Sequence, residues 1–337
     1  MTATFQSRAL EASKPLLGRC CFPDEAAPLA CAVSGGADSL ALMVLAVASG
    51  REVVAHHVDH GLRQDSGQDV QVVHEVAIAV GAEVVIHRVH VAPGPNLEAR
   101  ARAARFGVLP KGAATGHTAD DQAETVLLNL LRGAATDGLA AMRRGPRHPI
   151  LGLRRAETRG LCARLGLQPV EDPANEDPAY LRNRVRHELV PMLCELARRD
   201  VVPILARQAG LLADDASLLD ELAGELDPTD VRSLMDAPSP LARRAVREWL
   251  RRAHLPGAAR VDPGAHPPDS ATVERVLSVA DGRSRAADVG SGRRVRRSKG
   301  RLHLEPASAP SVDLDDSAQP PCSPGTPGLC QRRWAIQ

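Results

Sequence analysis

The chain has 337 residues, a length that suggests two domains, or two and a small third. Apolar residues make up 44%, enough for a buried core, whereas the net charge of +1 argues neither for nor against a nucleic-acid partner. The longest apolar run, 40–48, is far shorter than the roughly 20 residues of a membrane span, and the N-terminus lacks the apolar centre of a signal peptide. The 7 cysteines form no C-x-x-C pair. This excludes the usual zinc and iron–sulfur patterns and predicts a protein of the reducing cytoplasm.

Strand-like and helix-like segments alternate along the first part of the chain. Apolar runs of strand length are each followed by a stretch of helical periodicity that ends at a glycine, such as Gly50 or Gly81. This alternation predicts an α/β fold, a doubly wound parallel sheet with helices on both faces. The predicted strands are 29–34, 52–58, 82–91 and a short segment at 113–116, and the predicted helices are 39–49, 67–80, 96–109 and 119–132.

Strand signals fade after about residue 195 and then return briefly. Segments 203–225 and 238–254 are predicted helices, and a Pro- and Gly-rich break at 256–268 separates them from a compact α+β piece at 271–305. The last segment, 306–337, is rich in Pro, Ser and Asp and is predicted to be a disordered tail.

The first chemical motif is the run Ser34-Gly35-Gly36-Ala37-Asp38-Ser39, between a strand and a helix. Two glycines let the backbone turn closely around a ligand, and the first N–H groups of the helix form an anion site. Asp38 would repel a bare phosphate, so its presence indicates a bridging Mg²⁺ ion. The Walker pattern G-x-x-x-x-G-K-[ST] is absent. The alternative is a serine-capped helix after a glycine turn.

Two further motifs follow later strands. His60 and Arg63 come after the second strand, where they can reach a nucleotide, although a plain polar loop is the alternative. In the run 115–125, Thr118 has the position of an N-cap, with Asp121 three residues further on in capping-box spacing. Asp121 and Glu124 share one helix face, where they can bind an amine or Mg²⁺, whereas Asp120 points elsewhere. The alternative is that these acids bind no ligand and occur in the first turn of the helix because the helix dipole favours negative charge there.

Five segments, in this order, resemble the tRNA(Ile)-lysidine synthetase family of N-type ATP pyrophosphatases, the PP-loop superfamily. They are SGGADS (34–39), HVDHGLR (57–63), NLEARARAARF (96–106), TGHTADDQAETVLLNLLRG (115–133) and DPANEDPAYLRNRVRHELVPML (172–193). The resemblance covers about 29–195 and implies a PP-loop ATPase fold of the adenine nucleotide alpha hydrolase type. It implies a catalytic domain at 1–200, a helical linker domain at 201–256 and a small tRNA-binding domain at 257–305, before the tail at 306–337.

The resemblance also implies a reaction. ATP adenylates carbon 2 of the wobble cytidine in the CAU anticodon of tRNA(Ile) and releases pyrophosphate. The amine of L-lysine then displaces AMP, which leaves lysidine. The implied partners are this tRNA, L-lysine, ATP and Mg²⁺, and family members are often dimers, so a homodimer is a further expectation.

Residue roles follow from the same resemblance. The turn residues Ser34, Gly35, Gly36, Ala37, Asp38 and Ser39 would hold pyrophosphate, with Asp38 on the metal, and His60 and His117 would contact ATP. Asp121 and Glu124 would bind the lysine ammonium group and help to deprotonate it. Arginines would stabilise charge on phosphate or RNA: Arg102 or Arg105, with Arg182, Arg184 or Arg186. The resemblance does not assign these roles one by one.

Further residues are candidates for contact with the RNA. Tyr180, the single tyrosine, can stack on a base or pack in a core. The arginine-rich helix 238–254 and the basic stretch 283–301 are candidate backbone contacts, with a solvated face as the alternative for the helix.

Two other functions remain open from the sequence. Another PP-loop enzyme, such as a tRNA thiolase or an amidotransferase-type synthetase, is one, although paired cysteines at the usual spacing and a glutaminase domain are both missing. A nucleotide-binding protein without catalysis is the other, and the retained Asp38, Asp121 and Glu124 argue against it.

Overall fold

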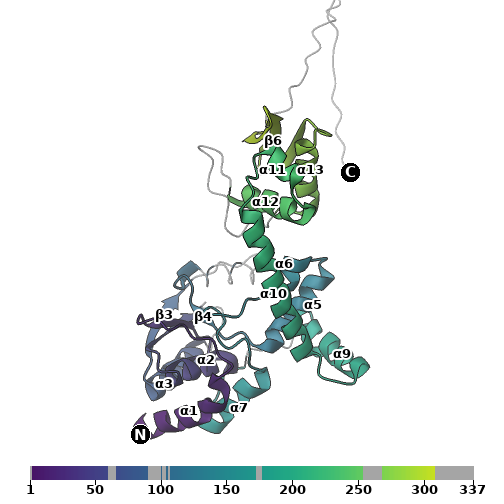
Figure 1. The fold of residues 1–337 in the computed structure, drawn as a ribbon. Helices are drawn as coiled ribbons and strands as arrows, with labels where there is room; N and C mark the ends of the chain where they lie inside the picture. The colour runs from purple at the N-terminus through teal and green to yellow at the C-terminus, as the bar shows by residue number, and fades with distance from the viewer. Residues whose placement is uncertain are drawn as a thin grey trace, which may run out of the picture. The chain divides into compact units, whose positions relative to one another are not determined.

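The computed structural model describes residues 2–59, 66–89, 100, 104, 107–171, 177–252 and 268–307. The chain divides into two compact units, Met1–Leu222 and Ala223–Gln337 (Figure 1). The four-part division implied by the resemblance stays a prediction. Among the helices in the described ranges, none combines the length and the apolarity that crossing a bilayer requires.

The first unit is built on a parallel sheet of four strands in the order β3-β2-β1-β4. The strands are β1 Leu29–Ala32, β2 Val53–Asp59, β3 Glu83–Arg88 and β4 Ala114–Thr115. β1 pairs in parallel with β2 on one side and with β4 on the other. The predicted α/β fold with a parallel sheet is therefore confirmed. Because the chain leaves β1 in one direction and returns at β4 in the other, the carboxyl ends of these two strands mark the expected ligand crevice.

Helices α2 Ala37–Ala48 and α3 Ser66–Val80 pack on the strands of this sheet. Helices α1 Thr2–Leu17 and α7 Arg155–Leu165 pack in turn against α2, on its side away from the sheet (Figure 1). Helix α2 is apolar on all sides and is buried without interruption from Ser39 to Ala46. It fills the centre of the main hydrophobic core, and this burial fixes the direction in which its N-terminus points. The sequence analysis predicted α2 and α3 but neither α1 nor α7.

The remaining helices of the first unit follow β4. They are α5 Ala119–Leu131, α6 Thr136–Leu139, α8 Leu181–Arg184, a five-residue π-helix Val185–Leu189, α9 Val190–Ala197 and α10 Val202–Gly224. Val185 of the π-helix packs against Leu127 and Leu128 of α5 in a small core of its own. This contact holds the chain around residues 182–186 against α5, where it bears on the site described below.

The second unit combines α11 Val231–Asp236, α12 Ser239–Arg252 and α13 Ser270–Ala280 with an antiparallel sheet of three strands. The strands β5 Ala286–Gly290, β6 Arg293–Ser298 and β7 Arg301–Pro306 lie in sequence order. Val276, Val279 and Val295 are fully buried in their shared core. The α+β piece predicted at 271–305 is thereby confirmed.

Candidate active site

The turn after β1 is held in shape by its own side chains. The backbone N–H of Ser34 donates to Ser39 Oγ at 3.1 Å, and Ser39 Oγ donates to the carbonyl of Gly36 at 2.8 Å. Gly35 has φ +89°, in the left-handed region that favours glycine, and its carbonyl accepts the N–H of Val170. Gly36 is the N-cap of α2, which starts at Ala37. The turn therefore has the strand–turn–helix context that a phosphate site requires.

The turn between β4 and α5 lies directly against this phosphate turn. A Cβ on Gly116 would lie 2.8 Å from the carbonyl oxygen of Asp38 and 3.0 Å from Cα of Ser39. Only the absence of a side chain lets the two backbones approach so closely. The sequence placed the two motifs at neighbouring strand ends, and the structure brings them into contact.

His117 belongs to a small polar cluster at the end of β4. Thr115 Oγ1 lies 2.7 Å from His117 Nδ1 and 2.8 Å from His148 Nδ1, and the two imidazole rings meet edge to face. Burial, with the nearby His117 and Arg147, lowers the pKa of His148 to about 4. His148 is therefore neutral at physiological pH and orients Thr115 and His117 without adding charge.

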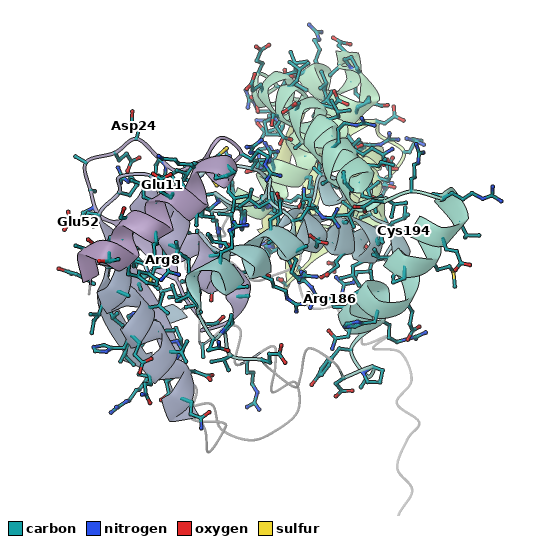
Figure 2. All side chains as sticks on the ribbon, turned by 90° about the horizontal axis from the view of Figure 1, so that it is seen from below. Arg8, Glu11, Asp24, Glu52, Arg186 and Cys194 are labelled. Atoms are coloured by element: carbon teal, nitrogen blue, oxygen red, sulfur yellow. The ribbon has the colours of Figure 1, made fainter. Side chains whose placement is uncertain are left out.

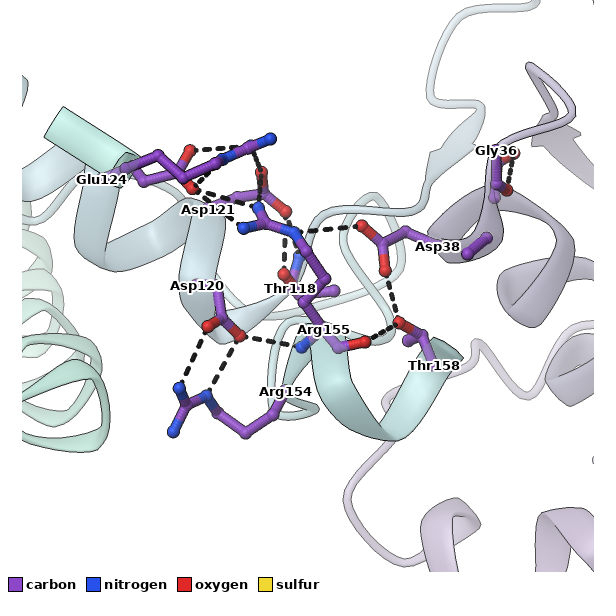
Figure 3. Close-up of polar contacts among 12 residues, drawn as sticks. Gly36, Asp38, Thr118, Asp120, Asp121, Glu124, Arg154, Arg155 and Thr158 are labelled. Atoms are coloured by element: carbon purple, nitrogen blue, oxygen red, sulfur yellow. Dashed lines mark hydrogen bonds and ion pairs between the residues drawn. The ribbon is translucent and has the colours of Figure 1, made fainter. Parts of the chain in front are cut away.

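Helix α5 starts at the cap predicted from the sequence. Thr118 is its N-cap, and Asp121 Oδ2 accepts both the backbone N–H of Thr118, at 2.9 Å, and its hydroxyl, at 2.8 Å. Asp121 is thus fixed with its second oxygen, Oδ1, on the same side as Glu124. Asp120 points away from this pair, as expected (Figure 3).

Three arginines surround Asp121 and Glu124. Arg155 Nη2 lies 3.0 Å from Asp121 Oδ1, and its Nη1 lies 3.1 Å from Glu124 Oε1. Arg182 reaches Asp121 Oδ1 at 3.1 Å and Glu124 Oε2 at 3.0 Å. Arg186 of the π-helix, labelled in Figure 2, has its Nε 2.7 Å from Glu124 Oε1. The Glu124 side chain is only 2% exposed, so this buried charge depends on its arginine partners.

These contacts control the ionisation of Asp121. Burial by itself would raise the pKa of Asp121, but the charges of Arg155 and Arg182 outweigh it, so the pKa lies below its ordinary value. Burial alone would lower the pKa of Arg155, but the negative charges of Asp121 and Glu124 outweigh burial, so this pKa lies above its ordinary value. Asp121 and Arg155 are therefore both charged near neutral pH.

Asp38 and the acid pair are linked through the first turn of α7 (Figure 3). The Thr158 hydroxyl donates to Asp38 Oδ1, and Arg155 Nε lies 3.6 Å from Asp38 Oδ2. Burial raises the pKa of Asp38, although the hydrogen bond from Thr158 works against this shift. One guanidinium, that of Arg155, therefore contacts both the phosphate turn and the acid pair.

The start of α7 is anchored to the start of α5. Asp120 accepts Nε and Nη2 of Arg154, both at 3.0 Å, and also the backbone N–H of Arg155 at 2.8 Å. The N–H of Ala119 donates to the carbonyl of Leu153 at 2.8 Å. Asp120 therefore fixes the backbone from which the Arg155 side chain extends.

The sequence analysis missed Arg154, Arg155 and Thr158, more than 30 residues beyond the acidic motif. One local signal could have found the two arginines, because they occupy the N-cap and first position of a helix. Positive charge is unfavourable there unless a ligand or an acid compensates for it.

The remaining predicted residues divide into three groups. Arg182 and Arg186 reach the acid pair, whereas Arg184 pairs with Glu188 instead. Tyr180 is 41% exposed at the start of α8, and its stacking role stays a prediction. Several candidates lie outside the described residues: His60, Arg63, Arg102 and Arg105.

The second unit carries a basic hollow beside its sheet. Six of the residues that line it are Gly282, Arg285, Arg294, Arg296, Arg297 and Lys299. Two of these arginines, Arg294 and Arg296, lie 3.4 and 4.0 Å from the single acid Glu305. Arginines of α12 also pair with acids of their own unit, Arg243 with Glu274 and Arg251 with Glu248. The hollow differs from α12 in that its basic side chains line one concave surface.

The chain is similar to known proteins of one family. The PP-loop domain family matches residues 1–193. A tRNA(Ile)-lysidine synthase of Rhodococcus erythropolis is 43% identical over 236 residues, which cover 65% of this chain and 72% of that protein. One of Nocardia farcinica is 43% identical over 245 residues, 68% of this chain and 77% of that protein. Among solved structures, a U34-tRNA thiolase of Methanococcus maripaludis is 20% identical with a TM-score of 0.44, covering 61% of this chain and 79% of its own.

Proposed function

Because the chain belongs to the tRNA(Ile)-lysidine synthase family of PP-loop ligases, we propose that it joins L-lysine to carbon 2 of the wobble cytidine in the CAU anticodon of tRNA(Ile). The cytosine oxygen attacks the α-phosphorus of ATP, and the bond to pyrophosphate breaks. The lysine amine then attacks carbon 2, loses a proton and expels AMP. The products are lysidine, AMP and pyrophosphate.

One structural observation gives this proposed reaction its strongest support. A single side chain, Arg155, lies 3.6 Å from Asp38 in the phosphate turn and 3.0 Å from Asp121 in the acid pair. A phosphate site and a site for a cationic amine are thus adjacent, and a reaction that first consumes ATP and then an amine needs this adjacency.

In the proposed reaction, the acid pair positions the amine. Asp121 and Glu124 are buried on one helix face, so their carboxylates would attract the ammonium group of lysine and hold it beside the activated base. A carboxylate that accepts the amine proton makes the nitrogen nucleophilic. The phosphate turn, Ser34–Ser39, would hold the pyrophosphate that leaves, and His117 would contact the nucleotide.

Magnesium fits the phosphate turn as an ion that arrives with the nucleotide. Mg²⁺ in nucleotide sites takes one or two carboxylates and completes its shell with phosphate oxygens and water. The Asp38 side chain is 26% exposed and adjoins the turn, so it would supply that carboxylate. Among the described residues, no three His, Cys, Asp or Glu side chains are arranged to hold a metal ion by themselves. When bound, the ion would neutralise charge on the phosphates.

The basic hollow of the second unit is the surface that we assign to the RNA backbone. Its arginines and Lys299 offer several positive charges within one concave surface. Binding of tRNA to this surface would weaken steeply as salt rises, because counterions compete for the same phosphates. Filter binding at several salt concentrations measures this, and affinity that is insensitive to salt would contradict the assignment.

The reaction itself is tested with the complete protein, ATP, isotopically labelled L-lysine and a tRNA(Ile) transcript. Mass analysis of the digested RNA should show labelled lysine on the first anticodon nucleoside, with AMP and pyrophosphate formed in equal amounts. A transcript with uridine at that position is the control and should stay unlabelled. ADP as the product, or pyrophosphate release that needs a sulfur donor in place of lysine, would refute the proposal.

A further inference from the structure

The acid pair is fully occupied by protein donors. Asp121 Oδ1 accepts from Arg155 and Arg182, and Asp121 Oδ2 accepts twice from Thr118. Glu124 Oε1 accepts from Arg155 and Arg186, and Glu124 Oε2 from Arg182 and Arg186. An ionised carboxylate has about four lone-pair positions on its two oxygens. Every oxygen already has at least two donors, so no acceptor position is left for an incoming ammonium group.

Charge leads to the same conclusion. Three carboxylates, Asp38, Asp121 and Glu124, face three guanidinium groups in one cluster, and Arg159 adds positive charge near Asp38. A further positive charge would enter a site whose carboxylates already have positive partners, where an uncompensated ion is unfavourable. An amine can therefore bind to this pair only if one arginine first moves away.

Arg155 is best placed to move. Arg182 and Arg186 contact the acid pair, whereas Arg155 also lies beside Asp38, next to the phosphate turn. Its backbone is fixed by Asp120, so a rotation of the side chain alone would carry the guanidinium toward bound phosphates. Guanidinium groups form bidentate bonds with phosphate as readily as with carboxylate.

We propose that Arg155 is an exchangeable counter-ion that occupies the amine's position on Asp121 and Glu124 until a nucleotide in the phosphate turn draws it away. This rests on the proposed function, in which the acid pair binds the amine. Its consequence is an order of binding: nucleotide first and amine second. Withdrawal of Arg155 frees acceptor positions on Asp121 Oδ1 and Glu124 Oε1, which are the ones that an ammonium group would take.

The proposal is tested by calorimetric titration of L-lysine into the full chain, alone and with an ATP analogue that has a methylene group between its α and β phosphates. For the unmodified protein, the analogue should tighten lysine binding at least about tenfold, within the range of ordinary coupling between sites. Arg155→Met should bind lysine without nucleotide about as tightly as the unmodified protein does with it, and the analogue should then add little. Arg164→Met, a matched change on the exposed side of α7, should behave like the unmodified protein.

The outcomes separate this proposal from the proposed function. Equal lysine affinity with and without the analogue in the unmodified protein would overturn the counter-ion role and leave the ligase reaction intact. Absence of lysine binding in every state, including with analogue and tRNA together, would overturn both the counter-ion role and the proposed function. If Arg155→Met does not fold, the titrations of the unmodified protein still decide the matter. Arg155→Lys, which keeps the charge but loses the planar fork, should then show a weaker dependence on nucleotide.

Discussion

The phosphate turn and the acid pair are the two ends of the proposed site, but their shapes have different origins. Bonds among Ser34, Gly36 and Ser39, all within six residues, set the turn, and a buried helix fixes its direction. The acid pair depends on Arg155, Arg182 and Arg186, which lie 31 to 62 residues away in sequence. The shape of a phosphate-binding turn can therefore be set by residues close in sequence, whereas a buried pair of negative charges needs positive side chains that only the tertiary fold brings close.

The largest expected effect comes from removing the carboxylate of the phosphate turn. Asp38→Ala should lower pyrophosphate release with ATP and tRNA by at least about a hundredfold, because the proposed metal ligand is lost. Thr158→Val is the control, since it removes one hydrogen bond to Asp38 but keeps the carboxylate, and its effect should be much smaller. Undiminished adenylate formation by the Asp38 variant would contradict the assignment.

The second change separates the two ends of the site. Glu124→Ala should leave pyrophosphate release within a few-fold of normal but reduce lysine transfer by about a hundredfold, because the amine loses one of its acids. Release of pyrophosphate and incorporation of labelled lysine are measured in the same reaction. Glu124→Gln keeps the shape of the side chain, and its thermal melting shows whether the buried arginines tolerate the loss of charge. Normal lysine incorporation by either variant would exclude the proposed role.

The third change pushes the two ends apart without altering a charge. Gly116→Ala places a Cβ 2.8 Å from the Asp38 carbonyl oxygen, so the turns must separate. We expect a stability loss of about 1–3 kcal/mol in urea unfolding and roughly a tenfold loss of lysidine formation. Gly107→Ala, where nothing lies within 4 Å, is the matched control and should change neither. Wild-type activity in Gly116→Ala would show that the close approach is not required.

The smallest effect is expected at the anchor of α7. Asp120→Asn weakens the bonds to Arg154 and to the Arg155 backbone, and should cost about 1–2 kcal/mol in urea unfolding. Burial would raise the pKa of Asp120, but Arg154 and the Arg155 N–H lower it below its ordinary value. The stabilisation is therefore complete above a pH of about 3.9 and is lost as the pH falls through the lowered pKa. A stability difference that stays constant through this range would argue against the ion pair.

Much of the fold could be predicted because its signals are local. The strand at Leu29–Ala32, the helix from Ala37 and the cap at Thr118 each follow from periodicity, glycines or capping residues close in sequence. The same holds for the pairing of Asp121 with Glu124, since helical geometry places residues three apart on one face. The phosphate turn and the acidic helix were therefore predictable in position and in chemical character.

The sequence by itself determined where the acidic residues and the glycine turn at the start of a helix lie, because these properties depend on near neighbours. Only the tertiary structure decided what neutralises the acids, because α7 and the π-helix reach them through packing against α2 and α5. The local signal at Arg155 is only a positive charge at the start of a helix, and its importance arises from the position of its guanidinium between Asp38 and Glu124. Electrostatic balance in a buried site is a property of distances in space, and the spacing of residues along the chain does not specify them.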